Sequence, residues 1–245
     1  MRRLRTWKET LKLYLRKQKI SREDNIRISF AYLFRIKVDG KYLLVRNSRG
    51  TNKYQPVGGS YKVEQEEKLY LKDNFFVSDD DKIPIDESSQ NDYRMLVPAK
   101  FLKKFVRRFN KTPNREKLSN LSREFKEELI NTEILDYSEI KYRYCGRHIT
   151  DLNFSRHFQC YELMLADVVE FLPTTEQKTK LRRLKETQSD KYIFATKDEI
   201  EHCGIVEGTD QLKEIIGDHS FKILSEYEIK LNRIKHDRGC YHIFL

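Results

Sequence analysis

Apolar residues recur at helical spacing in a ten-residue stretch near the middle of the chain. Leu121, Phe125 and Leu129 are four residues apart, so an α-helix would place them on one face. Three acidic residues of the same stretch would share a neighbouring face: Glu124, Glu127 and Glu128. The pattern predicts a helix that buries its apolar stripe and presents a cluster of carboxylates. Such a cluster suits a divalent cation such as Mg²⁺, although a solvated acidic face is the ordinary alternative.

Strand patterns surround this helix on both sides. Ile28–Val38 and Lys41–Arg46 are rich in β-branched and aromatic residues, and Asp39-Gly40 between them is a strong turn signal, so we expect a β-hairpin. Further strands are expected over 139–144, 156–165, 191–195 and 241–245, with 146–155 as a connection. Helices are expected over 174–187 and from Thr196 to Gly204, the second opened by a capping box. The chain therefore belongs to the α/β class.

Charge changes sign abruptly between the hairpin and the central helix. Residues 64–92 carry ten acids and three lysines, which indicates a solvated, mobile loop rather than a cation site at Asp79-Asp80-Asp81. Residues 94–117 carry nine basic residues and one acid, and the spacing of Phe101, Phe105 and Phe109 predicts a helix there. Its cations either contact phosphates or form a solvated exterior, and we favour the exterior for most of them.

The net charge of +10 favours a polyanionic partner, which includes nucleotides, nucleic acids and acidic membrane surfaces. Nucleic acid is the least favoured of these because charge alone supports it. The four cysteines are widely spaced, which argues against a zinc site or a disulfide framework and favours a cytoplasmic location. No run of 18 apolar residues predicts a membrane-spanning helix.

The first 25 residues form a separate basic segment. Nine Lys or Arg residues accompany only three acids, and Leu4, Trp7 and Leu11 fall at helical spacing. This amphipathic helix either docks on an anionic membrane or a partner, or packs on its own domain with its basic face in solvent. We favour packing, because amphipathicity is the norm for surface helices.

Two short motifs resemble those of the Nudix superfamily. Arg123 to Glu128 resembles the core of the Nudix box, and Tyr54 to Gly59 resembles the segment with two glycines that precedes it. The resemblance implies that Glu124, Glu127 and Glu128, here called the box glutamates, hold Mg²⁺ or Mn²⁺ against a diphosphate. Gly58 and Gly59, here called the glycine pair, would let the backbone approach a ligand closely.

The box departs from its usual pattern in three respects. Between Gly59 and Arg123 lie 63 residues where the superfamily has about a dozen, Gln65 stands at the first Glu position, and Ile130 replaces the closing Gly. The long intervening segment, with Asp92–Pro98 and Asn114 to Glu116, is similar to that of the SMODS-associated NUDIX family. These domains accompany nucleotidyltransferases that make cyclic oligonucleotides in bacterial anti-phage signalling (CBASS). In relatives two transmembrane helices precede the domain, so this chain is either a soluble member or an excised domain.

The resemblance implies a Nudix-like mixed β-sheet between helices over residues 26–245, with an insertion at about 64–117 inside the box. The basic helix over 1–25 would precede it. We expect the ligand-binding residues to include members of both motifs and one arginine of the insertion: Tyr54, Gln55, Gly58, Gly59, Arg115 and Arg123. Arg123 would also orient the box glutamates. His148 and His157 are weaker candidates, because isolated histidines near strand ends are more often surface or packing residues.

Three functions remain open from the sequence. The first is a sensor that binds a cyclic oligonucleotide and signals through self-association or an effector partner. The second is a hydrolase, in which the box glutamates position Mg²⁺ or Mn²⁺ to activate water and cleave a nucleoside diphosphate-type linkage. The third and least favoured is a nucleic-acid-binding module. Whether the chain is an enzyme therefore stays undecided.

Overall fold

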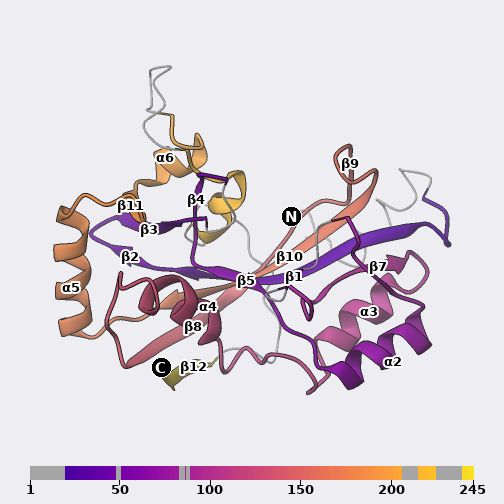
Figure 1. Ribbon diagram of the computed structural model, residues 1–245. Helices are drawn as coiled ribbons and strands as arrows, with labels where there is room; N and C mark the ends of the chain where they lie inside the picture. The colour runs from indigo at the N-terminus through magenta and orange to yellow at the C-terminus, as the bar shows by residue number, and fades with distance from the viewer. Residues whose placement is uncertain (1–19, 48–50, 83–85, 87–88, 206–214, 225–238) are drawn as a thin grey trace, which may run out of the picture. The chain divides into compact units, whose positions relative to one another are not determined.

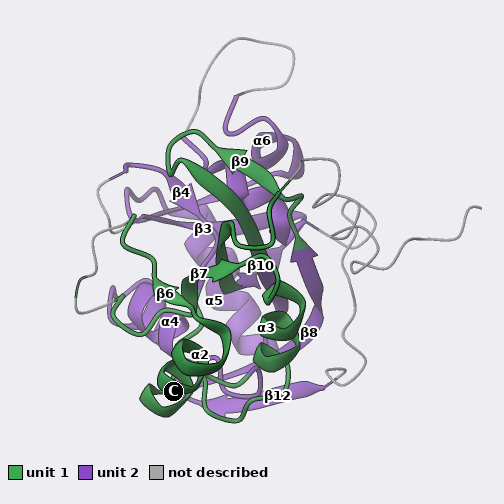
Figure 2. Cartoon of the chain, turned by 90° about the vertical axis from the view of Figure 1, so that its right-hand side faces the viewer, with its two compact units in different colours: residues 1–31, 60–117, 149–165 green, residues 32–59, 118–148, 166–245 purple. Residues whose placement is uncertain are grey.

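The computed structural model describes residues 20–47, 51–82, 86, 89–205, 215–224 and 239–245. The chain forms two compact units, coloured separately in Figure 2. Unit 1 comprises Met1–Ala31, Ser60–Lys117 and Ile149–Leu165, and unit 2 comprises Tyr32–Gly59, Leu118–His148 and Ala166–Leu245. Strands and helices occur in both, which confirms the α/β class.

Unit 1 combines short strands with two helices. The strands are the first residues of β1 (Asn25–Arg35), β6 (Ser78–Asp79), β7 (Arg94–Pro98), β9 (Asn153–Ser155) and the first residues of β10 (Cys160–Phe171). The helices are α2 (Gln65–Phe75) and α3 (Leu102–Phe109), which lie side by side in Figure 1. β1 pairs antiparallel with β7, and β7 with β6.

The core of unit 1 is built from aromatic rings. Phe30 of β1 stacks on Phe109 of α3 with 3.7 Å between ring centroids, and Tyr93 meets the edges of both rings. Phe105 packs against the same group. The apolar face predicted for α3 is therefore confirmed, and it anchors the helix on β1 because large rings bury the most apolar surface per residue.

The expectation of a solvated loop over 64–92 is wrong. Gln65–Phe75 forms α2, and Glu67 on this helix is fully buried, where it accepts hydrogen bonds from Arg108 and Thr112. Asp80 is also buried and is paired with Arg27 at 2.8 Å and Arg94 at 3.0 Å. Counting charges missed this arrangement because the partners of these acids lie far away in the sequence.

Unit 2 holds the remaining strands and both sequence motifs. Its strands are the last residues of β1 and of β10, β2 (Lys37–Val38), β3 (Lys41–Arg46), β4 (Tyr54–Gln55), β5 (Gly58–Ser60, whose last residue belongs to unit 1), β8 (Glu139–Ile149, whose last residue also belongs to unit 1), β11 (Tyr192–Ala195) and β12 (Cys240–Phe244). Its helical segments are α4 (Arg123–Phe125), η1 (Lys126–Ile130), α5 (Thr175–Glu186), α6 (Lys197–Glu201) and η2 (Asp218–Ile223). β11 pairs with β3, which pairs with β2 and β4, while β12 pairs with β8.

Several local predictions for unit 2 are confirmed. The Asp39-Gly40 turn joins β2 to β3, and the capping box of Thr196 and Glu199 opens α6. A second capping box, between Thr174 and Gln177, opens α5. The connection expected over 146–155 is wrong in extent, since β8 continues to Ile149 and 153–155 form β9.

Of the helix predicted over 1–25, residues 1–19 lie outside the described part of the chain. Residues 20–24 are described, and they precede β1 without helical structure. In the described part of the chain, no helix is long and apolar enough to cross a membrane.

Removing the partner of the buried Glu67 should destabilise unit 1. Arg108 donates to both carboxylate oxygens, at 2.8 and 2.6 Å, so Arg108→Ala leaves a buried carboxylate without its counter-charge. Because Arg108 is itself 31% exposed, we expect a loss of about 2–3 kcal/mol in the free energy of unfolding, the range for hydrogen bonds to a charged group. Arg107→Ala, an exposed position on the same helix, is the matched control and should change it by less than about 0.5 kcal/mol. Equal effects of the two substitutions in urea melts would contradict the assignment.

Candidate functional site

The glycine pair lies directly against the box glutamates. The backbone N–H of Gly58 donates a hydrogen bond of 2.8 Å to Oε2 of Glu128. Gly58 has a φ of +147°, and a Cβ there would overlap the carbonyl oxygen of Tyr32. Glycine is therefore required at this position, both for the backbone conformation and for the approach to β1.

Gly59 leaves room for a carboxylate of the box. A Cβ at this position would overlap the carboxylate of Glu124, whose Oε1 occupies the space that a side chain would need. The two glycines thus hold two different glutamates of the box, Gly58 through its amide and Gly59 through its missing side chain. The glycine pair and the box, which are separated by 63 residues in the sequence, are therefore in direct contact in the fold.

The box helix is not a regular α-helix. α4 ends at Phe125, and Lys126–Ile130 forms a π-helical turn in which the N–H of Asn131 reaches the carbonyl of Lys126 at 2.8 Å. Leu121, Phe125 and Leu129 are buried as predicted. The glutamates differ in exposure, since the Glu127 side chain is 51% exposed while that of Glu124 is 13% exposed. The three carboxylates nevertheless lie near one another, because Arg123 contacts both Glu124 and Glu127, and both of these raise the pKa of Glu128. Such π turns are frequent at functional sites.

The helix ends without the glycine of the usual pattern. Ile130 is the last residue of η1, and the left-handed conformation is adopted three residues later by Glu133, with a φ of +61°. The N–H of Glu133 donates to the carbonyl of Ile130 at 2.9 Å. The departure at Ile130 is thus accommodated by a longer exit turn.

Tyr142 of β8 fixes the start of the box helix. Its hydroxyl accepts a hydrogen bond from the N–H of Leu121 and donates one to the carbonyl of Leu118, both at 2.9 Å. The Phe125 ring packs on Phe34 with 5.4 Å between centroids. Sequence reasoning missed Tyr142, because a tyrosine in a strand gives no sign of the distant backbone it will contact.

The charges of the box are balanced within the chain. Arg123 Nη1 lies 2.5 Å from Oε1 of Glu124 and 3.5 Å from Oε2 of Glu127, which confirms the expected salt bridge. Burial, with the neighbouring Glu124 carboxylate, raises the pKa of Glu128 to about 8. The Gly58 N–H and the Gln55 side chain oppose this shift by hydrogen-bonding the carboxylate. Glu128 is therefore mostly protonated at neutral pH.

The donor chemistry of the box fits a hard divalent cation, since Mg²⁺ and Mn²⁺ take carboxylate oxygens. A bound cation would neutralise the repulsion between Glu124 and Glu128 and lower the pKa of a bound water molecule. In the described part of the chain, however, no three acidic, histidine or cysteine side chains converge on one point. The box glutamates are the residues that would hold such a cation, with Arg123 orienting Glu124 through its salt bridge.

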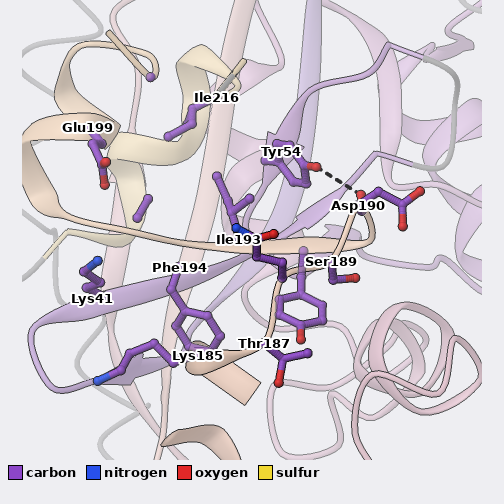
Figure 3. Close-up of a pocket in the computed structure, with 14 residues that line it drawn as sticks. Lys41, Tyr54, Lys185, Thr187, Ser189, Asp190, Ile193, Phe194, Glu199 and Ile216 are labelled. Carbon is purple, nitrogen blue, oxygen red and sulfur yellow. Dashed lines mark hydrogen bonds between the residues drawn. The ribbon is translucent and has the colours of Figure 1, made fainter. Parts of the chain in front are cut away.

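Tyr54 belongs to a second group of residues. It lines a cavity of about 730 Å³ on β11, and its hydroxyl donates to the carbonyl of Asp190 at 3.0 Å, as Figure 3 shows. Neither the glycine pair nor any box glutamate lines this cavity. Gln55, the next residue, hydrogen-bonds Glu128 instead. The ligand-binding residues predicted in unit 2 thus fall into two sets. Tyr54 lines the cavity, the others belong to the box and the glycine pair, and Gln55 joins the second set from the same strand, β4.

The remaining candidates have structural contacts. Arg115 lies in unit 1, where its guanidinium donates to the carbonyls of Phe109 and Glu116 and covers the Phe109 ring. His148 packs edge-on against Phe221, and His157 is exposed beside its neighbour Phe158. Ligand binding by Arg115 stays a prediction.

A methyl group at position 59 should disturb the box through Glu124 alone. We expect Gly59→Ala to lower the free energy of unfolding by about 1–3 kcal/mol, the usual cost of overpacking. Glu124→Ala in the same chain removes the overlapping carboxylate, so the double variant should recover most of this loss. Strictly additive effects in denaturant melts would show that the two residues do not meet.

Comparison with known proteins agrees with this geometry. No curated protein matches the chain. The family model described as the SMODS-associated NUDIX domain matches residues 25–224, which include the glycine pair, the box helix and the intervening segment. The chain therefore belongs to the SMODS-associated NUDIX domain family.

Proposed function

We propose that this domain binds a cyclic oligonucleotide and acts as a sensor in bacterial anti-phage defence. Membership of a family associated with SMODS systems links it to nucleotide signalling. The observation that carries the proposal is the state of the box: Glu124 is held by Arg123, and Glu128 by Gly58 and Gln55. A Glu128 carboxyl that is buried and hydrogen-bonded in this way binds a cation less readily, which favours ligand binding over turnover.

The charge of the chain supports an anionic ligand. A net charge of +10 attracts phosphates over the range of a Debye length, which raises the rate of encounter. The cavity on β11 has a volume in the usual range for small ligands, roughly 300–1,000 Å³. A messenger bound there would signal through self-association or an effector partner.

A hydrolase is the alternative, and one observation favours it. Glu124 and Glu128 lie against the glycine pair, as metal-dependent cleavage of a diphosphate would need. In that case the box glutamates would hold Mg²⁺ or Mn²⁺, and Arg123 would orient them through its salt bridge. The raised pKa of Glu128 opposes this at neutral pH, because a cation binds the ionised carboxylate.

The fate of the ligand separates the two functions. Calorimetric titration with a panel of cyclic di- and trinucleotides, with and without Mg²⁺, should find one member that binds. Chromatography of the mixture after prolonged incubation should recover that member intact. Linear products would establish the hydrolase, provided that the Glu127→Gln and Glu128→Gln double variant no longer forms them. Absence of binding to every member of the panel would contradict the sensor.

A further inference from the structure

The cavity on β11 has the chemistry of a nucleotide subsite. Phe194 and the hydroxyls of Thr187 and Ser189 line it, and Lys41 reaches it from β3. In Figure 3 the Phe194 ring lies between Lys41 and the hydroxyl-bearing residues. An aromatic surface, hydrogen-bonding groups and a cation are the three features that a base, its polar edge and a phosphate require.

The other charges around the cavity are already used inside the protein. Lys185 is paired with Asp39 at 2.9 Å, and the Glu199 carboxylate accepts the N–H of Thr196 at 2.8 Å. Asp190 is exposed and lies 3.3 Å from Arg46. Lys41, by contrast, forms no ion pair with any residue that the structure describes. Its ammonium group can therefore meet a phosphate without breaking an existing contact.

Phe194 offers an accessible aromatic surface. It lies on β11 and is only half-buried, and the Tyr192 ring meets it edge-on with 6.1 Å between centroids. This contact restrains the Phe194 ring, and a flat ligand can bind the exposed part of that ring by stacking. Every nucleobase has such a flat face, so stacking selects a nucleotide without selecting one base.

β4 connects this cavity to the box. Successive side chains of a strand point to opposite faces, and here Tyr54 lines the cavity while Gln55 hydrogen-bonds Glu128. A ligand that displaced Tyr54 from the Asp190 carbonyl would move Gln55 as well. A ligand bound in the cavity can therefore change, through β4, the hydrogen bond that Gln55 makes with Glu128.

We propose that the cavity on β11 is the nucleotide subsite of this domain, with a base on Phe194 and a phosphate at Lys41. The inference rests on the proposed function and names its site. It places ligand recognition beside β11 and leaves the box glutamates as a structural element that responds through β4.

Paired variants test this subsite. Lys41→Glu reverses the charge in the cavity, Phe194→Leu removes the flat ring but keeps an apolar side chain, and Lys178→Glu reverses an exposed charge on α5 outside the cavity as the matched control. Thermal melts first establish that each variant folds. Dissociation constants are then measured by calorimetry for cyclic di-AMP, cyclic tri-AMP and linear ADP.

Lys41→Glu should weaken binding at least about tenfold, the effect of losing one charge-assisted hydrogen bond. Phe194→Leu should weaken it about fivefold, the range expected for base stacking, while Lys178→Glu should stay within about twofold. If Lys41→Glu and Phe194→Leu bind as the control does, the subsite is wrong. If ADP binds in the cavity but no cyclic compound does, the subsite stands and the proposed sensor fails. If neither class binds, both are overturned.

Discussion

The contact between the glycine pair and the box glutamates is the constraint on which the candidate site depends. Gly58 supplies an amide to Glu128, and Gly59 leaves the space that Glu124 occupies. A Cβ at Gly58 would meet the backbone of β1, which cannot yield, whereas a Cβ at Gly59 would push the Glu124 carboxylate out of its place. Tyr142 then fixes the segment that leads into the helix by two hydrogen bonds, with the backbone of Leu118 and of Leu121. The box is therefore held at both ends by groups outside the helix.

This packing also sets the electrostatics of the site. Glu128 is removed from water beside a second carboxylate, which raises its pKa, and Arg123 compensates the charge of Glu124. A site that neutralises its own carboxylates has little attraction for a cation until those contacts open. Ligand recognition can then lie elsewhere, and β4 supplies the route, because Tyr54 and Gln55 contact the cavity and the box respectively. In the proposed sensor, the two-residue strand β4 links ligand binding to the box.

The sequence predicted those features that depend on local spacing. The buried stripe of Leu121, Phe125 and Leu129, the Asp39-Gly40 turn and the capping box at Thr196 all follow from neighbours within a few residues. Features that depend on distant partners were missed or wrong. The π-helical turn has no signature in residue spacing, and the acidic segment folds as a helix because Glu67 finds Arg108, which lies 41 residues away. A run of acidic residues is solvated only when the fold brings no basic side chain to pair with them.

The amide resonance of Gly58 tests the central claim most directly, because it reports on the hydrogen bond to Glu128. In a ¹⁵N-labelled sample without divalent cations, its chemical shift should change with pH through a midpoint near 8, the pKa of the Glu128 carboxyl. The Gly40 amide is the control. It lies in an exposed turn, where an added Cβ would meet no atom within 4 Å, and its chemical shift should not follow this transition. A midpoint near 4.5, or a Gly58 shift insensitive to pH, would show that the glycine pair does not hold a buried carboxyl.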